Sequence, residues 1–205
     1  MKKVIFLLAC VLAISTASAQ EKKGCMAFEF GIGTTHYGNY SPMSVFSDPT
    51  DNYSLLATEY LSFGYRHSNG WFVGLALNND GGSTSFQSLN ESFTNSFVML
   101  DLREFFELGN RIELETGVAL GLLIHRNSFD HDNDHYSFTR FGGSAYFLLG
   151  MNYLIKENRT IGIRAMFPCY GALWGESPEL PTGLEATNKT QSVGYSLQVG
   201  YGIRF

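Results

Sequence analysis

Beyond its N-terminus the sequence has no apolar run long enough to cross a bilayer as a helix, which takes about 20 residues. It also shows no long stretch of helical periodicity, so any membrane-spanning form of this chain has to be a closed barrel of strands. Positive charge is scarce, since 14 Lys and Arg residues stand against 19 Asp and Glu residues, for a formal net charge of −5. That balance argues against a nucleic-acid partner, whose phosphates need a basic surface.

The one strongly apolar segment lies at the N-terminus. Two lysines precede the apolar run 4–14, and small residues follow at 17–19. This order predicts a cleaved secretory signal peptide, residues 1–19. Cys10 resembles the end of a lipoprotein signal, but too short an apolar run precedes it for that reading. The rest of the chain, residues 20–205, has a length that suits one domain.

Cysteine is also scarce, and only Cys25 and Cys169 lie outside the predicted signal. An exported chain with two cysteines invites a disulfide. The strand pattern described below places Cys25 at the start of the first strand and Cys169 at the far end of the seventh. A strand of ten residues advances about 33 Å, whereas a disulfide needs Cα atoms within about 7 Å of each other. We therefore expect two free thiols.

Segments of alternating apolar and small or polar residues recur along the chain, and turn residues separate them. In the clearest segment, residues 111–124, large or β-branched residues at even positions alternate with Arg, Glu, Gly and Ala. A period of two predicts strands, and segments of about ten residues are typical of transmembrane barrels. Eight segments occur, near residues 25–37, 53–66, 71–78, 93–106, 111–124, 138–154, 161–167 and 193–205.

The connections between these segments alternate in length. Three are tight turns, at 67–70, 107–110 and 156–159, and four are long, at 38–52, 79–92, 126–137 and 171–191. Short turns on one side and long loops on the other are typical of outer-membrane barrels, with the turns in the periplasm. The pattern predicts an all-β protein, an eight-stranded antiparallel up-and-down transmembrane β-barrel with short periplasmic turns, long extracellular loops and both termini periplasmic.

An alternation with a period of two residues does not by itself say which face of the sheet contacts water, because soluble lipocalin-type barrels show the same alternation. Here the polar stripe consists of Gly, Ala and Ser with a few charges of both signs, which suits a narrow, plugged interior in which buried charges are paired. Aromatic residues on the apolar stripe gather at the turn side, as girdles do. Glu59 shares the apolar stripe and needs a rim position or a nearby bulge. The predicted luminal charge network is Glu29, Arg66, Asp101, Arg103, Arg111, Glu113, Glu115, Arg164 and Arg204.

The C-terminal strand ends in an aromatic and apolar alternation, Tyr201, Ile203 and Phe205. It resembles the terminal signal of outer-membrane proteins, and the whole chain resembles the small barrels of the OmpA/OmpX transmembrane type. The resemblance implies that the barrel assembly machinery reads the last strand. It also implies a monomer, located in the bacterial outer membrane and exported through the periplasm, with membrane lipid and lipopolysaccharide as its surroundings and no cofactor.

Two groups of residues carry possible chemistry near the end of the fifth segment. His125, Ser128 and Asp130 resemble the catalytic set of lipid A-modifying barrel enzymes, a deacylase and a palmitoyltransferase, although the deacylase has its His and Ser two residues apart rather than three. A nucleophile needs its base within hydrogen-bonding reach. The candidate ligands for a divalent cation are His131, Asp132, Asp134 and His135, but their spacing matches no strong motif and an acidic solvated loop is the favoured reading.

The favoured function is therefore a structural or surface-interaction role, adhesin-like, with a plugged lumen. An extracellular partner would meet the loops, of which 171–191 is the longest. Two alternatives stay open: a lipid A-modifying enzyme and a narrow channel for small solutes. We expect no metal and no catalytic residue in the favoured reading.

Overall fold

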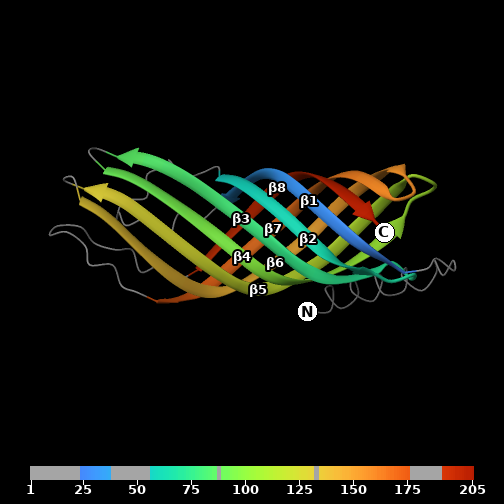
Figure 1. Cartoon of the computed structure of the whole chain (residues 1–205), viewed down its shortest axis with the longest axis horizontal. Coiled ribbons are helices and arrows are strands. Elements are labelled where there is room, and N and C mark those ends of the chain that lie inside the picture. Colours follow the sequence, from blue (N-terminus) through green and yellow to red (C-terminus); the bar gives the residue numbers. More distant parts are fainter. Residues whose placement is uncertain (1–23, 38–55, 87–88, 132–133, 176–190) are drawn as a thin grey trace, which may run out of the picture.

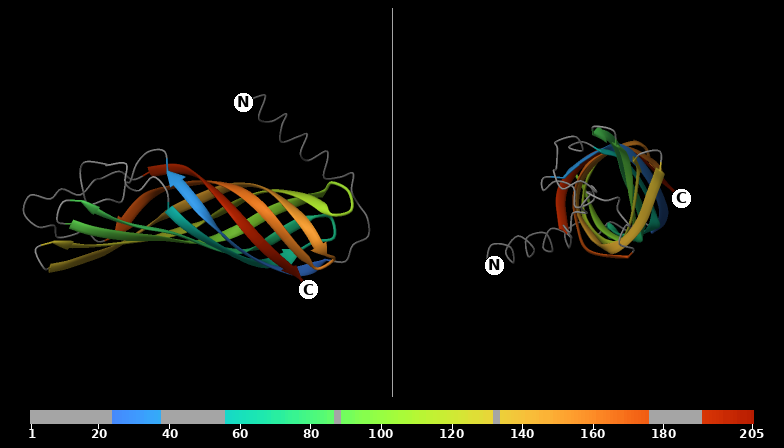
Figure 2. Two further views of the ribbon diagram at one scale, coloured as in Figure 1. Left: turned by 90° about the horizontal axis from the view of Figure 1, so that it is seen from above. Right: turned by 90° about the vertical axis from the view of Figure 1, so that its left-hand side faces the viewer.

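The computed structural model describes residues 24–37, 56–86, 89–131, 134–175 and 191–205 and shows a closed barrel (Figure 1). Each strand pairs antiparallel with the next along the chain, and β8 pairs with β1 to close the ring (Figure 2). This confirms the predicted eight-stranded fold. The strands are β1 (Cys25–Tyr37), β2 (Leu56–Arg66), β3 (Trp71–Phe86), β4 (Leu89–Glu107), β5 (Ile112–His131), β6 (Asp134–Lys156), β7 (Arg159–Gly175) and β8 (Gln191–Arg204). The predicted signal peptide lies outside the described residues.

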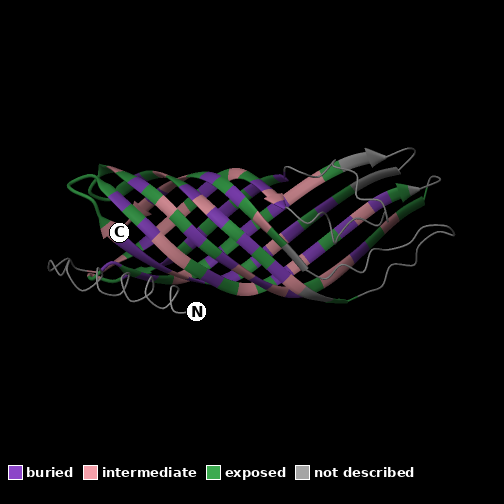
Figure 3. Cartoon of the chain, turned by 180° about the vertical axis from the view of Figure 1, so that it is seen from behind, coloured by how far each residue is buried: buried purple, intermediate pink, exposed green. Residues whose placement is uncertain are grey.

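Buried and exposed side chains alternate along the strands, as the checkered wall in Figure 3 shows. The exposed side is the apolar stripe: Leu75 and Leu120, for example, are 63 % and 57 % exposed. The assignment of faces made from the sequence is therefore confirmed. The interior holds more than small and charged residues, because Phe97, Leu123 and Met166 are buried there as well.

Two predicted loops are wrong. Within the described residues, 79–86, 89–92, 126–131 and 134–137 continue the strands, since β3 and β4 stay paired up to Phe86 and Leu89, and β5 and β6 up to His131 and Asp134. The outer face of these segments is polar, so the apolar stripe that marks a membrane strand is lost, although the backbone ladder continues and Phe129 is buried on the inner face. Strands β3–β6 consequently project beyond the others as a four-stranded sheet, at the left in Figure 1. We call this the protruding sheet and this end of the barrel the loop end.

The opposite end, the turn end, carries the three short turns together with the start of β1 and the end of β8. Gly70 has a φ of 95°, and a Cβ there would lie 2.7 Å from the Phe105 carbonyl oxygen, so the first turn needs a glycine. Phe205 N donates a hydrogen bond of 2.9 Å to Met26 O, which ties the chain end to β1. The aromatic girdle lies at this end, with Tyr65, Trp71, Tyr153 and Phe205 exposed and Phe106 and Tyr201 half-buried.

Three smaller expectations concern the cysteines, the charge of Glu59 and the absence of a membrane-spanning helix. Cys25 and Cys169 are both free thiols, as predicted. Glu59 faces outward near the loop end of β2, with a regular register to β1 and β3, so its rim position rather than a bulge explains the charge. Among the described residues, no helix is long and apolar enough to cross a membrane.

The close approach of β4 and β5 makes Gly121 a test of the fold. A Cβ at Gly121 would lie 2.0 Å from the Val98 carbonyl oxygen, whereas at Gly143 it would meet nothing within 4 Å. We expect Gly121→Ala to destabilise the barrel by roughly 1–3 kcal/mol through overpacking and Gly143→Ala to stay within about 0.5 kcal/mol. Urea unfolding of the barrel in detergent micelles measures both. Equal stabilities for the two variants would contradict the strand packing described here.

Candidate functional site in the polar interior

The inward-facing polar side chains form clusters stacked along the barrel axis. The cluster nearest the turn end consists of Arg66, Glu113 and Arg204. Both Nη atoms of Arg66 donate to the Glu113 carboxylate, at 3.1 and 3.0 Å, and Arg204 donates to the same carboxylate from its own two Nη atoms. The Arg66 guanidinium also lies 4.3 Å from the centre of the Phe105 ring. Two arginines thus share one buried carboxylate.

The central cluster contains two arginines and three carboxylates. Arg103 is fully buried and donates to Glu29 and to Glu115, the latter at 3.2 Å, while its Nε lies 3.1 Å from Asp101 Oδ2. Arg164 donates to Glu115 at 2.6 Å and to Glu29 at 2.7 Å. Each carboxylate is therefore in contact with at least one guanidinium, which is what allows these charges to be buried.

Neutral groups complete the central cluster, and none of them was singled out from the sequence. Tyr60 Oη and Ser62 Oγ donate to Asp101 Oδ2 at 2.8 and 3.0 Å, and Arg103 donates to Ser62 Oγ at 2.9 Å. The free space beside Glu29 and Arg164 amounts to about 10 Å³. That is about the volume one water molecule needs, so the side chains of the cluster pack closely at this point.

A third cluster surrounds Asp80 on the loop-end side of the central cluster. Asp80 accepts hydrogen bonds from Thr35 at 3.3 Å, from Asn78 at 3.1 Å and from Tyr37. Asn78 also donates to Tyr146 Oη at 3.0 Å. Sequence reasoning missed this cluster because Asp80 fell in a predicted loop, where no inward parity was assigned. Extending the β3 alternation by one step, from Asn78 to Asp80, would have found it.

The predicted catalytic set is not assembled. His125 points into the barrel, fully buried, with its Nδ1 2.8 Å from Asn95 Oδ1 and its ring between those of Phe93 and Phe138. Ser128 is three residues further on and therefore lies on the other face of β5, where its Oγ is 2.8 Å from Ser92 Oγ. Asp130 shares that outer face and bonds to His135 instead. The candidate base and nucleophile are on opposite sides of the barrel wall.

The proposed cation ligands are only partly described. Asp130 and His135 form an exposed contact of 2.7 Å, and Asp134 is exposed beside them. Asp132 and the side chain of His131 lie outside what the structure describes. Within the described part of the chain, no three His, Cys, Asp or Glu residues are grouped so as to hold a metal ion.

Arg111 was wrongly assigned to the luminal network. It precedes β5, which begins at Ile112, so strand parity does not apply to it, and its side chain is exposed outside the barrel. There Arg111 Nη1 donates to Tyr153 Oη at 3.1 Å. The other eight network residues lie in the two charged clusters described above.

The residues of the predicted assembly signal lie on the outer side of β8 and at its end. Tyr201 packs against Phe30 of β1 with ring centroids 5.8 Å apart, and Phe205 follows the last strand residue and is 75 % exposed. The side chains are therefore accessible on the barrel exterior, where another protein could contact them. Recognition by an assembly machinery stays a prediction.

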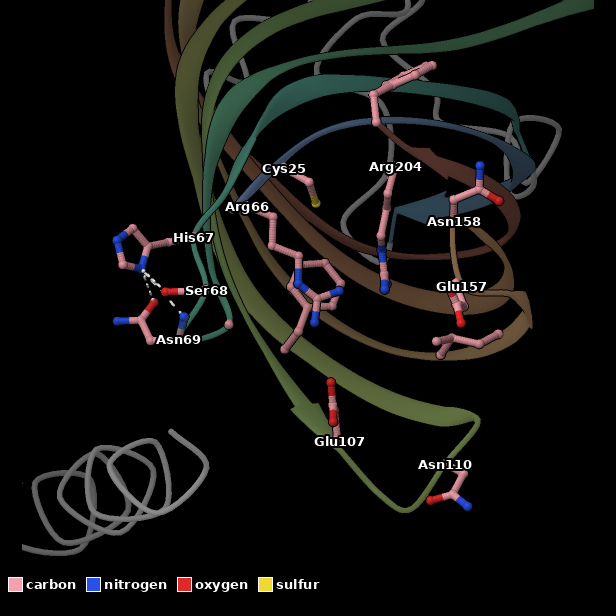
Figure 4. Close-up of a pocket in the computed structure, with 14 residues that line it drawn as sticks. Cys25, Arg66, His67, Ser68, Asn69, Glu107, Asn110, Glu157, Asn158 and Arg204 are labelled. Atoms are coloured by element: carbon pink, nitrogen blue, oxygen red, sulfur yellow. Dashed lines mark hydrogen bonds between the residues drawn. The ribbon is translucent and has the colours of Figure 1, made fainter. Parts of the chain in front are cut away.

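A cavity of about 580 Å³ opens at the turn end, and the Arg66 and Arg204 cluster forms its floor (Figure 4). Figure 4 shows the side chains of Arg66 and Arg204 reaching into it from β2 and β8. Phe105 and residues of the short turns line the rest. We call this cavity the vestibule, and its inner side is formed by the arginines that bind Glu113.

The central cluster predicts a large cost for removing one arginine. Arg103→Ala would leave Glu29 and Glu115 with Arg164 as their remaining guanidinium, and Asp101 with the hydroxyl groups of Tyr60 and Ser62 alone. We expect a loss of about 3–5 kcal/mol in unfolding free energy, as for other buried pairs that lose one member. Urea titration in micelles measures it, with Arg126→Ala at an exposed position as the control, expected within about 0.5 kcal/mol. A loss no larger than that of the control would contradict the pairing.

The chain is similar to known proteins in its fold but not detectably in its sequence family. No protein-family model matches the chain, and a search of curated proteins also finds no match. Among solved structures, it is similar to Ail, the attachment invasion locus protein of Yersinia pestis (14 % identity, 91 % of this chain and 100 % of that one, TM-score 0.51). It is also similar to Neisserial surface protein A (13 %, 89 % and 97 %, TM-score 0.53) and to a major outer membrane protein from Thermus thermophilus (14 %, 88 % and 99 %, TM-score 0.50). The chain therefore has the fold of the small outer-membrane β-barrels.

Proposed function

We propose that this chain is an integral outer-membrane protein with a closed lumen, whose protruding sheet forms a contact surface outside the cell. The proposal rests on one observation above all: an apolar exterior around the barrel is combined with a polar sheet that continues past it. The apolar exterior is suited to contact with the hydrocarbon of a bilayer, and the polar sheet is suited to contact with water. The similar structures supply the fold, and the role is argued from this chain's own surface.

The apolar exterior supports the membrane location. Every one of the eight strands carries large apolar side chains that point outward, among them Ile32 in β1, Leu100 in β4 and Leu197 in β8. Soluble monomers rarely expose apolar patches larger than a few hundred Å². A belt that continues around the whole barrel fits contact with hydrocarbon instead.

The protruding sheet supports the surface role. Within the described residues, β2 pairs with β3 only as far as Gly81, and β7 pairs with β6 only as far as Arg140. The sheet beyond these points has two edges, 82–86 and 134–139, whose backbone groups are not used in those ladders. Sheet edges pair with extended segments of other proteins. Its outer face is polar and carries the exposed pair Asp130 and His135.

The alternatives receive less support from the geometry. His125 and Ser128 lie on opposite faces of β5, which takes away the arrangement that suggested a lipid A-modifying enzyme. The central cluster leaves about 10 Å³ of free space, which does not fit a channel for solutes. Ail and Neisserial surface protein A are an attachment protein and a surface protein by their names, and a role of that class agrees with the protruding sheet.

Cysteine labelling tests the location and the orientation together. In a background with Cys25→Ser and Cys169→Ser, we expect Ser137→Cys on the protruding sheet to react with a membrane-impermeant maleimide on intact cells. Asn69→Cys, in an exposed turn at the other end, should react only after the outer membrane is permeabilised. Labelling of both positions on intact cells, or of neither, would contradict the proposed insertion.

Shortening one hairpin tests the contact surface. Replacing residues 128–137 with Asn-Gly joins Asn127 to its partner Phe138 through a tight turn and removes half of the protruding sheet's tip. We expect cells that express this variant to adhere less to a cultured-cell monolayer, because most of the 134–139 edge is removed. The matched control replaces Glu157-Asn158 at the turn end with Asn-Gly. Unchanged adhesion of the shortened variant would leave the barrel with a structural role only.

A further inference from the structure

An apolar groove crosses the outer wall of the barrel near the turn end. Its volume is about 280 Å³, close to the lower limit of about 300 Å³ for small-molecule sites. Two rows of outward side chains form its sides, one row nearer the turn end and the other one step above it. The first row is Ile112, Tyr153 and Ile161, and the second is Met151, Ile163 and Val199.

The turn-end side of this groove is basic. Arg111 lies there, exposed, and Leu154 N donates to the Arg111 carbonyl at 2.8 Å. Arg159 has the same outward parity as Ile161 and lies two residues nearer the turn end, and it pairs with the exposed Lys156. By strand register, the three cationic side chains Arg111, Lys156 and Arg159 thus lie on the turn-end side of the groove, and the turn at 157–158 holds one carboxylate, Glu157.

Arg111 is held in place at the groove. Its Nη1 donates to Tyr153 Oη at 3.1 Å, and the Tyr153 ring belongs to the first row of the groove wall. The contact fixes the guanidinium at the boundary between the apolar wall and the turn. A guanidinium presents its remaining N–H groups as a planar fork that matches a phosphate.

We propose that the groove and its basic border bind one glycerophospholipid, with an acyl chain in the groove and the phosphate on Arg111 and Arg159. The inference rests on the proposed function, because the groove has to face a bilayer, and it adds a specific lipid of the leaflet at the turn end. An apolar wall alone contacts any acyl chain without preference. Basic pockets beside membrane-embedded walls select phosphate head groups, and the two features meet here at one place.

Native mass spectrometry of the detergent-purified full chain tests this with two probes, phosphatidylglycerol and diacylglycerol that carry the same acyl chains. We expect a one-to-one adduct with phosphatidylglycerol and none with diacylglycerol. Arg111→Gln combined with Arg159→Gln should lower the adduct fraction by about tenfold, because a charge-assisted contact is lost. Arg126→Gln, at an exposed arginine near the loop end of the same β5, is the matched control and should leave the adduct unchanged.

A second pair of variants tests the groove itself. Ile163→Trp fills it and should abolish the phosphatidylglycerol adduct, whereas Leu75→Trp on the exposed outer face of β3 should not. Equal adducts in wild type and in the double Gln variant, an equal loss in Arg126→Gln, or equal binding of diacylglycerol would each overturn the proposal. A chain that passes the cysteine-labelling test but retains no phospholipid refutes this inference alone, whereas a chain that fails that test refutes the proposed function.

Discussion

The pairing of β8 with β1 is the contact on which the rest of the structure depends. It satisfies the backbone groups of the two strands that would otherwise be sheet edges, and only such closure lets a sheet expose apolar side chains on its whole outer face. Closure with eight strands also fixes a narrow interior. Side chains of suitable volume and balanced charge must fill that interior. In this chain they are stacked clusters of paired charges, hydroxyl groups and aromatic rings.

The central cluster shows why the interior is polar at all. Apolar side chains can fill a barrel of this width, and near the loop end Phe97 and Leu123 do so. Arg103, however, contacts residues from β1, β2, β4 and β5, so it joins strands that are far apart along the chain. A guanidinium with several partners specifies one arrangement of the wall more strictly than apolar packing does, because each unpaired charge would be costly. The contacts of Arg103 therefore tie β1, β2 and β5 to β4 across the interior of the barrel.

The sequence was sufficient for the eight strands, the outward apolar face and eight of the nine residues predicted for the luminal network, because period two carries all of that information. Prediction from the sequence failed where a strand begins and where the outward residues are no longer apolar. Arg111 lies one residue before a strand, where parity does not apply, and Asp80 lies where the outer face turns polar, so the strand was ended too early to include it. The separation of His125 from Ser128 was readable from their spacing of three, because an odd spacing puts two residues on opposite faces.

The two ends of the barrel differ in a way that follows from their environments. At the turn end, short turns, a girdle of aromatic residues and the basic side chains around Arg111 bring apolar and charged groups together, which is the composition of a membrane boundary. At the loop end, the four central strands continue beyond the apolar belt with their ladder intact and a polar outer face, while rings such as Phe129 are buried on the inner face. An insertion at the turn end would separate Arg111 from Tyr153, whereas the hairpin tips at the loop end are free to change length. We therefore expect changes in hairpin length to disturb the barrel least at the protruding sheet, where the proposed contact surface lies.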